Sequence, residues 1–161
     1  MTADEIKTLL NLERHPVEGG FFRRTYTSAL TVVLERGLRV QSTAIYYLLE
    51  AGIFSEMHRV SSDEIFHFYL GDPVEMLLLF PDGRSELLML GPDLQAGQRP
   101  QILVPAGVWQ GERLVEGGKL ALFGCTVTPG FDFADYTSGN YADLAAKWPA
   151  ESNRIRALTR S

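Results

Sequence analysis

Two stretches of the chain carry residues whose types and spacing could support chemistry. In residues 52–71, an alternating pattern predicts two short strands joined by a polar turn, with His58 on the first and Glu64 on the second. Side chains two residues apart on a strand share a face, so inward-facing strands would direct both groups into one cavity. Residues 104–112 predict a turn that brings Gln110 to the same place. A histidine and a carboxylate placed in this way can move protons, bind a metal or hydrogen-bond to each other.

Three further residues could contribute to such a cavity. Ser42 and Tyr46 share one face of a predicted strand and would add hydroxyl groups, although Tyr46 could equally be a core residue whose hydroxyl is satisfied. Arg23 lies on the first strand after a Gly-Gly turn, where its guanidinium would suit a carboxylate or phosphate of a ligand. A surface ion pair is the alternative for this arginine.

For the remaining candidates, a tryptophan and two histidines, position in the sequence is a weaker guide to role. Trp109 precedes Gln110 at the turn and either stacks on a ring or sugar or packs the end of the barrel. Alternation sends His67 outward, so it is a secondary candidate for ligand binding unless a bulge reverses it. His15 precedes a proline, and we interpret it as a helix-end residue in preference to a ligand.

The elements that must position these residues are mostly short strands. Thr2 and Glu5 fit a capping box that starts a helix, which should stop before Pro16. Many short strands separated by turn residues then predict an antiparallel barrel or jelly roll. Two short helices are expected in residues 141–148 and 151–158.

Composition limits the classes of partner. The chain has 161 residues, 45% of them hydrophobic, and a formal net charge of −5, which fits one domain over residues 1–161 with the barrel over about 16–130. The absence of a basic stripe argues against a nucleic-acid partner. No apolar run is long enough for a membrane span, and no signal peptide is evident, so we expect a cytoplasmic protein. The single cysteine, Cys125, excludes an intrachain disulfide and is interpreted as a small buried hydrophobe.

The first stretch resembles the first motif of the cupin superfamily. That motif has Gly, five residues, His, one residue, His, three or four residues, Glu, six residues and Gly. The sequence supplies Gly52, His58, Glu64 and Gly71 at these positions, with Val60 in place of the second histidine.

The second stretch is similar to the second cupin motif, which has Pro, one residue, Gly, two residues and His. Pro105 and Gly107 match it, with Gln110 in place of the histidine. More specifically, the stretches HPVEGGFFRRTY, STAIYYLLE, HRVSSDEIFHFYLGDP and VPAGVWQ resemble the uncharacterised single-domain "cupin-five" family over about residues 5–137. That resemblance implies an all-β, double-stranded β-helix barrel with short helices at both termini, often paired as a homodimer.

The departures from the motif bear on cofactors. A metal-binding cupin supplies three histidines and a glutamate, but here valine cannot coordinate and a glutamine oxygen is a weak ligand for zinc, iron or copper. We therefore expect no cofactor. A divalent metal at His58, Glu64 and Gln110 is the alternative.

Three functions are consistent with these residues. The first is a metal-independent isomerase or epimerase acting on a carbohydrate or nucleotide-sugar, with His58 as the base, Glu64 steadying it and Tyr46 as the acid. The second is a module that binds a small ligand without chemistry, and the third is a metal-dependent oxygenase or lyase. In each, the partners are a small molecule and a second copy of the chain.

Overall fold

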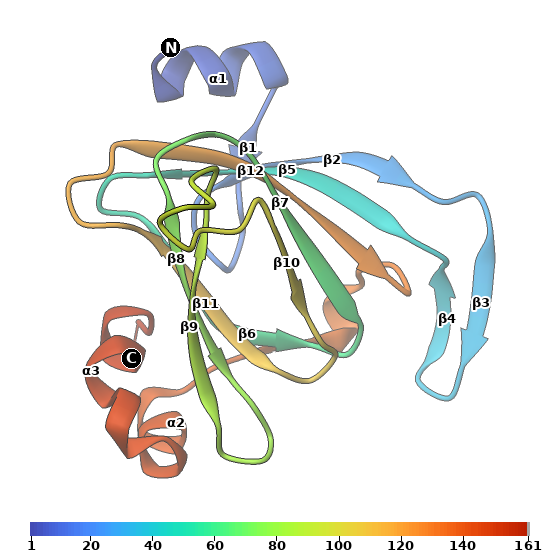
Figure 1. The fold of residues 1–161 in the computed structure, drawn as a ribbon. Coiled ribbons are helices and arrows are strands. Elements are labelled where there is room, and N and C mark those ends of the chain that lie inside the picture. Colours follow the sequence, from blue (N-terminus) through green and yellow to red (C-terminus); the bar gives the residue numbers. More distant parts are fainter. Residues whose placement is uncertain (161) are drawn as a thin grey trace.

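Two antiparallel sheets face each other in the computed structural model, which describes residues 1–160. One sheet has the order β1 (Glu13–Arg14), β2 (Phe21–Thr27), β5 (Thr43–Glu50), β12 (Leu120–Thr128), β7 (Asp63–Gly71) and β10 (Gln101–Val104). The other has the order β13 (Tyr136–Ser138), β6 (Phe54–Val60), β11 (Trp109–Leu114), β8 (Val74–Leu79) and β9 (Ser85–Leu90). This arrangement confirms the predicted all-β jelly roll (Figure 1).

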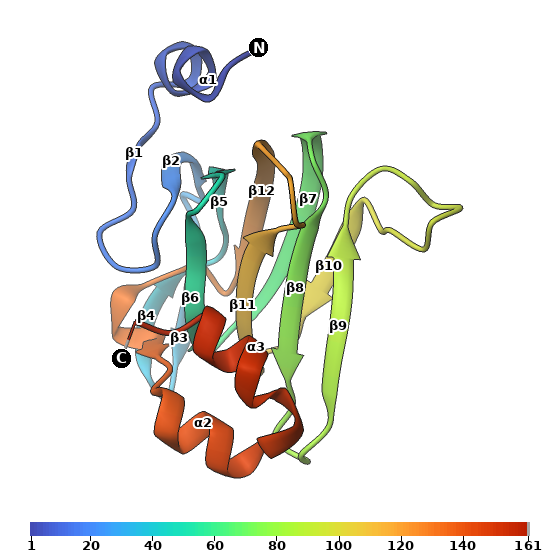
Figure 2. The same cartoon turned by 90° about the vertical axis from the view of Figure 1, so that its left-hand side faces the viewer.

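The main hydrophobic core lies between the two sheets, and two smaller cores lie on their outer faces. Phe123, Phe66 and Met76 are buried in the space between the sheets. The outer cores exist because helices cover both sheets, as Figures 1 and 2 show together. As a result, strands of both sheets are apolar on both faces, and hydrophobicity alone does not reveal which face points inward.

The helices are short and lie toward the two ends of the chain. Helix α1 (Ala3–Leu10) starts at the predicted capping box and buries Ile6 against the outer face of the six-stranded sheet. Helices α2 (Tyr141–Lys147) and α3 (Ser152–Ala157) pack over the outer face of the five-stranded sheet, joined by the 3₁₀ turn η2 (Pro149–Glu151). Among residues 1–160 none of the helices could cross a bilayer.

A bulge in β6 shapes the inner surface of the five-stranded sheet. His58 pairs with Gln110 of β11, whereas Ser55 pairs with Glu112, so three steps along β6 correspond to two along β11. An extra residue in one strand of a pair changes the alternation of its side chains. Both Ser55 and His58 therefore face the interior, although they are an odd number of residues apart.

A hairpin formed by β3 (Thr31–Leu34) and β4 (Gly37–Val40) projects from the end of the six-stranded sheet. Arg39 anchors the hairpin, because its Nε and Nη2 donate to the two carboxylate oxygens of Asp135 over 2.8 and 2.7 Å. Asp135 belongs to the 3₁₀ turn η1 (Phe133–Asp135), which leads into β13. Strand β13 extends the five-stranded sheet beyond the expected barrel end at residue 130, a short pairing that turn-rich flanks concealed.

We expect Asp135→Asn to lower the free energy of unfolding by about 1–2 kcal/mol at pH 7, because it weakens two charge-assisted hydrogen bonds at a buried carboxylate. The bonds from Arg39 lower the pKa of Asp135. A lowered native pKa gives stability that is present above about pH 3.9 and is lost as the pH falls through the native value. Urea unfolding should therefore show the difference narrowing in acid. The control is Asp82→Asn at an exposed turn, and an equal loss in both variants would contradict the anchoring role.

Candidate functional site

A cavity lies between the two sheets, where inward side chains leave space. Its volume is about 60 Å³, which holds about five water molecules at 10–15 Å³ for each. Carboxyl groups, two histidines and several aromatic rings line it. The site is therefore sized for a small polar group.

His58, Glu64 and Gln110 meet at one wall of this cavity, as their spacing in the sequence predicted. The turn that carries Pro105 delivers Gln110 onto β11, and it is held by a hydrogen bond from the Gly107 amide to the Val60 carbonyl (2.8 Å). The Gln110 side-chain amide donates to Glu64 over 2.7 Å and lies 3.3 Å from His58 Nε2. All three side chains are buried, with Gln110 completely so.

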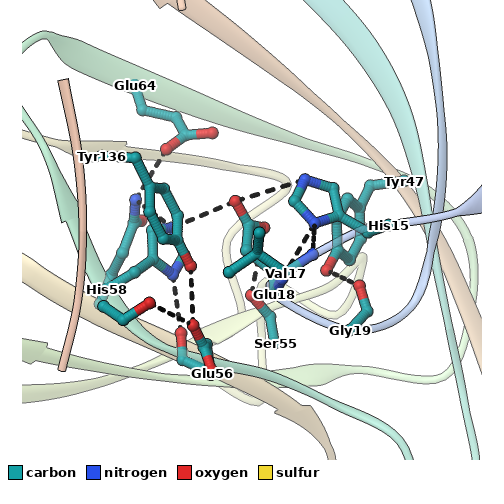
Figure 3. Close-up of polar contacts among 12 residues, drawn as sticks. His15, Val17, Glu18, Gly19, Tyr47, Ser55, Glu56, His58, Glu64 and Tyr136 are labelled. Atoms are coloured by element: carbon teal, nitrogen blue, oxygen red, sulfur yellow. Dashed lines mark hydrogen bonds and ion pairs between the residues drawn. The ribbon is translucent and has the colours of Figure 1, made fainter. Parts of the chain in front are cut away.

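The loop between β1 and β2 brings a second histidine and a second glutamate to the opposite wall. Glu18 Oε1 lies 3.6 Å from His15 Nε2 and 3.8 Å from His58 Nε2, so one carboxyl group sits between two imidazole rings (Figure 3). Gly19 and Gly20 turn the chain back with φ values of 110° and 68°, which only glycine adopts readily. The Tyr47 hydroxyl donates to the Gly19 carbonyl and fixes the loop to β5.

The two histidines present opposite hydrogen-bonding character to the cavity. His58 Nδ1 lies 2.7 Å from the Glu56 carbonyl, which can only accept, so Nδ1 carries the proton and Nε2 is an acceptor, with the Gln110 amide nitrogen 3.3 Å away. His15 Nδ1 accepts from the backbone amides of Val17 and Glu18 over 3.3 and 2.9 Å, so its Nε2 carries the proton. His58 is thus an acceptor toward Glu18, and His15 is a donor.

Burial determines the protonation states at the site. It raises the pKa values of Glu18, Glu64 and Glu112, and it lowers those of His15 and His58. Desolvation disfavours the charged form of any group. The carboxyls are therefore biased toward holding protons and the imidazoles toward being neutral bases, which is a suitable starting point for proton transfer.

Residues from other elements hold His58 and the loop of Glu18 in place. Tyr136 stacks on His58, with ring centroids 5.1 Å apart and planes at 16°, and its hydroxyl donates to Glu56 over 3.1 Å. Arg160 donates to the Val17 carbonyl over 2.8 Å, to the Glu18 carbonyl over 2.6 Å and to the Glu56 carboxylate over 2.6 Å. This arginine therefore holds the loop of Glu18 against β6.

Three predicted site residues lie outside the cavity. Tyr46 faces the outer side of the six-stranded sheet, where it packs near Tyr69 at 6.0 Å between ring centroids, so its predicted role as acid was wrong. Arg23 pairs across the ladder with Tyr46, shares its outward face and donates to the Leu10 carbonyl (3.3 Å). Ser42 is half-buried and donates to the Val127 carbonyl over 3.2 Å. The neighbours of opposite parity, Tyr47 and Arg24, line the cavity instead.

Trp109 and His67 also lie away from the cavity. Trp109 packs with the outer core beneath α2 and α3, with the Arg59 guanidinium 4.7 Å from its ring centroid. His67 points outward, as alternation predicted, and its Nε2 lies 3.1 Å from the Thr126 hydroxyl. Neither residue is placed to contact a ligand in the cavity.

Three residues of the cavity wall were not among the predicted site residues: His15, Glu18 and Glu112. His15 is buried in the cavity wall and is not a helix-end residue, because α1 ends at Leu10 and the chain then forms β1. Glu112 could have been found by parity, since it lies two residues after Gln110 on the same strand. It is 1% exposed, and its Oε1 has no hydrogen-bond partner.

The donor set does not fit the metal centre that the cupin resemblance implies. Val60 lines the cavity without a donor atom, and Gln110 turns its amide nitrogen, not its oxygen, toward His58 and Glu64. Within residues 1–160, no group of three or more His, Cys, Asp or Glu side chains is arranged to hold a metal ion. Divalent transition metals prefer the imidazole and thiolate ligands that are missing at these positions.

We expect Glu112→Gln to make the protein increasingly more stable than the wild type as the pH rises from about 5 to 8. The native pKa of Glu112 is well above its usual value, so the folded wild type holds a proton that the unfolded chain loses above about pH 4.3. Stability therefore falls as the pH rises, and an amide removes this loss. Urea unfolding at both pH values measures the difference. The exposed Glu116→Gln serves as the control, and an equal pH trend in both variants would contradict the prediction.

Comparison with known proteins agrees with this fold. A family model described as "Cupin superfamily (DUF985)" matches residues 4–138. The "Uncharacterized protein YML079W" of Saccharomyces cerevisiae is 31% identical over 134 residues, covering 74% of this chain and 67% of that protein.

Solved structures give the same result. Protein SO0799 from Shewanella oneidensis has a TM-score of 0.90 and 36% identity, covering 99% of this chain and 98% of that one. A hypothetical protein from Leishmania major has a TM-score of 0.91 and 29% identity with full coverage of both. Oxalate decarboxylase from Bacillus subtilis, at 18% identity and a TM-score of 0.58, shares the fold alone, and this chain covers 37% of it. The chain therefore belongs to the DUF985 family of the cupin superfamily.

Proposed function

We propose that the chain binds a small polar molecule in its cavity and moves a proton on it without a metal, in an isomerase or epimerase reaction on a carbohydrate-type substrate. The observation that carries the proposal is the Glu18 carboxyl between the Nε2 atoms of His15 and His58. The gaps of 3.6 and 3.8 Å are longer than hydrogen bonds, and catalytic contacts often tighten only when a substrate is bound.

The proposed step uses His58 as a neutral base and Glu18 as a protonated acid. His58 Nε2 takes a proton from the carbon next to a carbonyl, and Glu18 gives its proton to the carbonyl oxygen, forming an enediol. Return of the proton from His58 to the neighbouring carbon gives the isomer, and return of a proton to the other face of the same carbon gives the epimer. In both cases Glu18 recovers its proton from an enediol hydroxyl as the carbonyl forms again, so each group ends in its starting state. Nothing is oxidised or reduced overall, so the reaction needs no cofactor.

The cavity limits which part of a substrate can enter. A nucleotide-sugar would have to keep its diphosphate outside, because the cavity volume is small and it is lined by the buried carboxyls of Glu64 and Glu112 and by the 12% exposed carboxyl of Glu18. Buried carboxyls disfavour a like charge. A carbohydrate carbon bearing a carbonyl and a hydroxyl suits the space better.

We expect the protein to catalyse exchange of a carbon-bound hydrogen for deuterium when small aldoses, ketoses and their derivatives are screened in D₂O by NMR. His58→Ala and Glu18→Gln should each reduce the exchange rate by about 100-fold or more, the usual contribution of a general base or acid. His67→Ala, on the outer surface, is the matched control and should retain the rate.

Exchange that survives His58→Ala would contradict the assignment. Ligands that raise the melting temperature without exchanging would instead favour a non-catalytic binding module. Elemental analysis showing near one transition metal per chain, in protein purified without chelators, would contradict the metal-free part.

We also propose that the chain forms a homodimer through the β3–β4 hairpin. Val33 and Leu38 are cross-strand partners on one face of this hairpin, with 82% and 60% of their surfaces exposed. Apolar side chains grouped on an exposed hairpin favour association.

A cytoplasmic location stays a prediction of the sequence, to be tested by cell fractionation.

Light scattering should give a mass near twice the 18.0 kDa of one chain. Val33→Asp should shift the mass toward that of one chain, because it would bury a charge at the interface. Leu94→Asp, at a similarly exposed position far along the chain, is the control and should leave the mass unchanged. A wild-type mass near 18.0 kDa would refute the dimer.

A further inference from the structure

Within residues 1–160, two buried side-chain oxygens have no hydrogen-bond partner, Gln110 Oε1 and Glu112 Oε1, and Glu112 lines the cavity. Glu18, Glu64 and Glu112 all line it, and Glu112 Oε1 is buried without a hydrogen bond. Leaving a buried acceptor unpaired is costly. An oxygen in this position is suited to a donor that arrives with a ligand.

Few of the described residues that line the cavity are arginine or lysine. Among the described residues that line the cavity, Arg24 is the one arginine or lysine, and its side chain is exposed to solvent. His15 and His58 are lining groups whose burial lowers their pKa values. The three carboxyls therefore have no buried cationic partner within the cavity.

Aromatic rings form part of the remaining cavity wall, beside aliphatic side chains. Phe131 and Phe133 lie edge to face with centroids 5.0 Å apart, and Phe133 lies 6.2 Å from both Tyr136 and His15. Phe22 lies 4.8 Å from His15 on the other side. The faces of aromatic rings attract cations, particularly in sites shielded from water.

From these observations we infer that the cavity selects a small organic cation carrying N–H donors, namely a primary ammonium group on a short carbon skeleton. The ammonium donates to Glu112 Oε1 and compensates the charge that the neighbouring carboxyls carry when ionised, while the aromatic rings contact its carbon atoms. The inference deepens the proposed function by naming an amino group on the substrate, and it rests on the same cavity.

Three ligands of nearly equal size test this charge preference: propylammonium, propan-1-ol and propionate. Titration calorimetry at pH 7.5 should show propylammonium binding about tenfold or more tightly than propan-1-ol, and no saturable binding of propionate. Equal affinity for the alcohol, tighter binding of propionate, or no saturable binding of propylammonium would overturn the inference.

A variant tests the residue assignment. Glu112→Gln keeps the shape of the side chain and should weaken propylammonium binding about tenfold or more, because the wild-type carboxyl can release its proton and become an anionic acceptor when the ammonium arrives, which an amide cannot do. Binding of propan-1-ol should stay within about twofold. The control is the exposed Glu116→Gln, which should bind all three ligands as the wild type does. Circular dichroism confirms that each variant is folded, and unchanged propylammonium affinity in folded Glu112→Gln would overturn the role of Glu112.

The outcomes separate this inference from the proposed function. Ammonium selectivity without hydrogen exchange on any substrate would support the ligand class and contradict the proton-transfer reaction. If the protein catalyses hydrogen exchange on a carbohydrate but binds propylammonium no better than propan-1-ol, the proton-transfer reaction would be supported and the ammonium ligand contradicted.

Discussion

Burial of the Glu18 carboxyl between two imidazoles is the constraint on which the site depends. A buried carboxylate without a partner is unfavourable, so the group must hold a proton, share one with a histidine or meet a cation. Glu18 Oε1 lies 3.6 Å from His15 Nε2 and 3.8 Å from His58 Nε2, a geometry compatible with all three options. The surrounding barrel supplies the dry environment that makes the choice between them energetically important.

The loop that carries Glu18 would not be stable in this position by itself. Two glycines with positive φ allow it to turn, Tyr47 ties it to one sheet, and Arg160 ties it to β6 of the other. Glu56 takes part at both ends of this arrangement, since its carbonyl fixes the tautomer of His58 and its carboxylate pairs with Arg160. Glu56 therefore stabilises both His58 and the arginine that holds the Glu18 loop.

Much of the fold could be predicted from the sequence, because turn residues and short alternating segments mark a jelly roll. The meeting of His58, Glu64 and Gln110 could also be predicted, since spacing places them on adjoining strands. The inward face of β5 could not be predicted. Tyr46 and Leu48 alternate with Tyr47 and Leu49, and Tyr46 and Leu48 belong to the apolar cluster that helix α1 covers. Alternation identifies the two faces of such a strand but does not say which one the second sheet covers.

His15 and Glu18 were missed for a different reason. They lie in a loop whose course depends on contacts with Glu56 and Arg160, far away in the sequence, so local pattern carries no information about their direction. The bulge in β6 adds to this, because it brings Ser55 inward against simple alternation.

The position of Arg160 has a consequence for how members of this family differ. The family model matches residues 4–138, so the arginine that clamps the loop lies outside the segment that the family model describes. Proteins that align over the matched segment can keep every proton-carrying group and still vary in how firmly that loop is held. The firmness with which the loop is held can therefore vary with the C-terminal segment, while the residues that line the cavity remain the same.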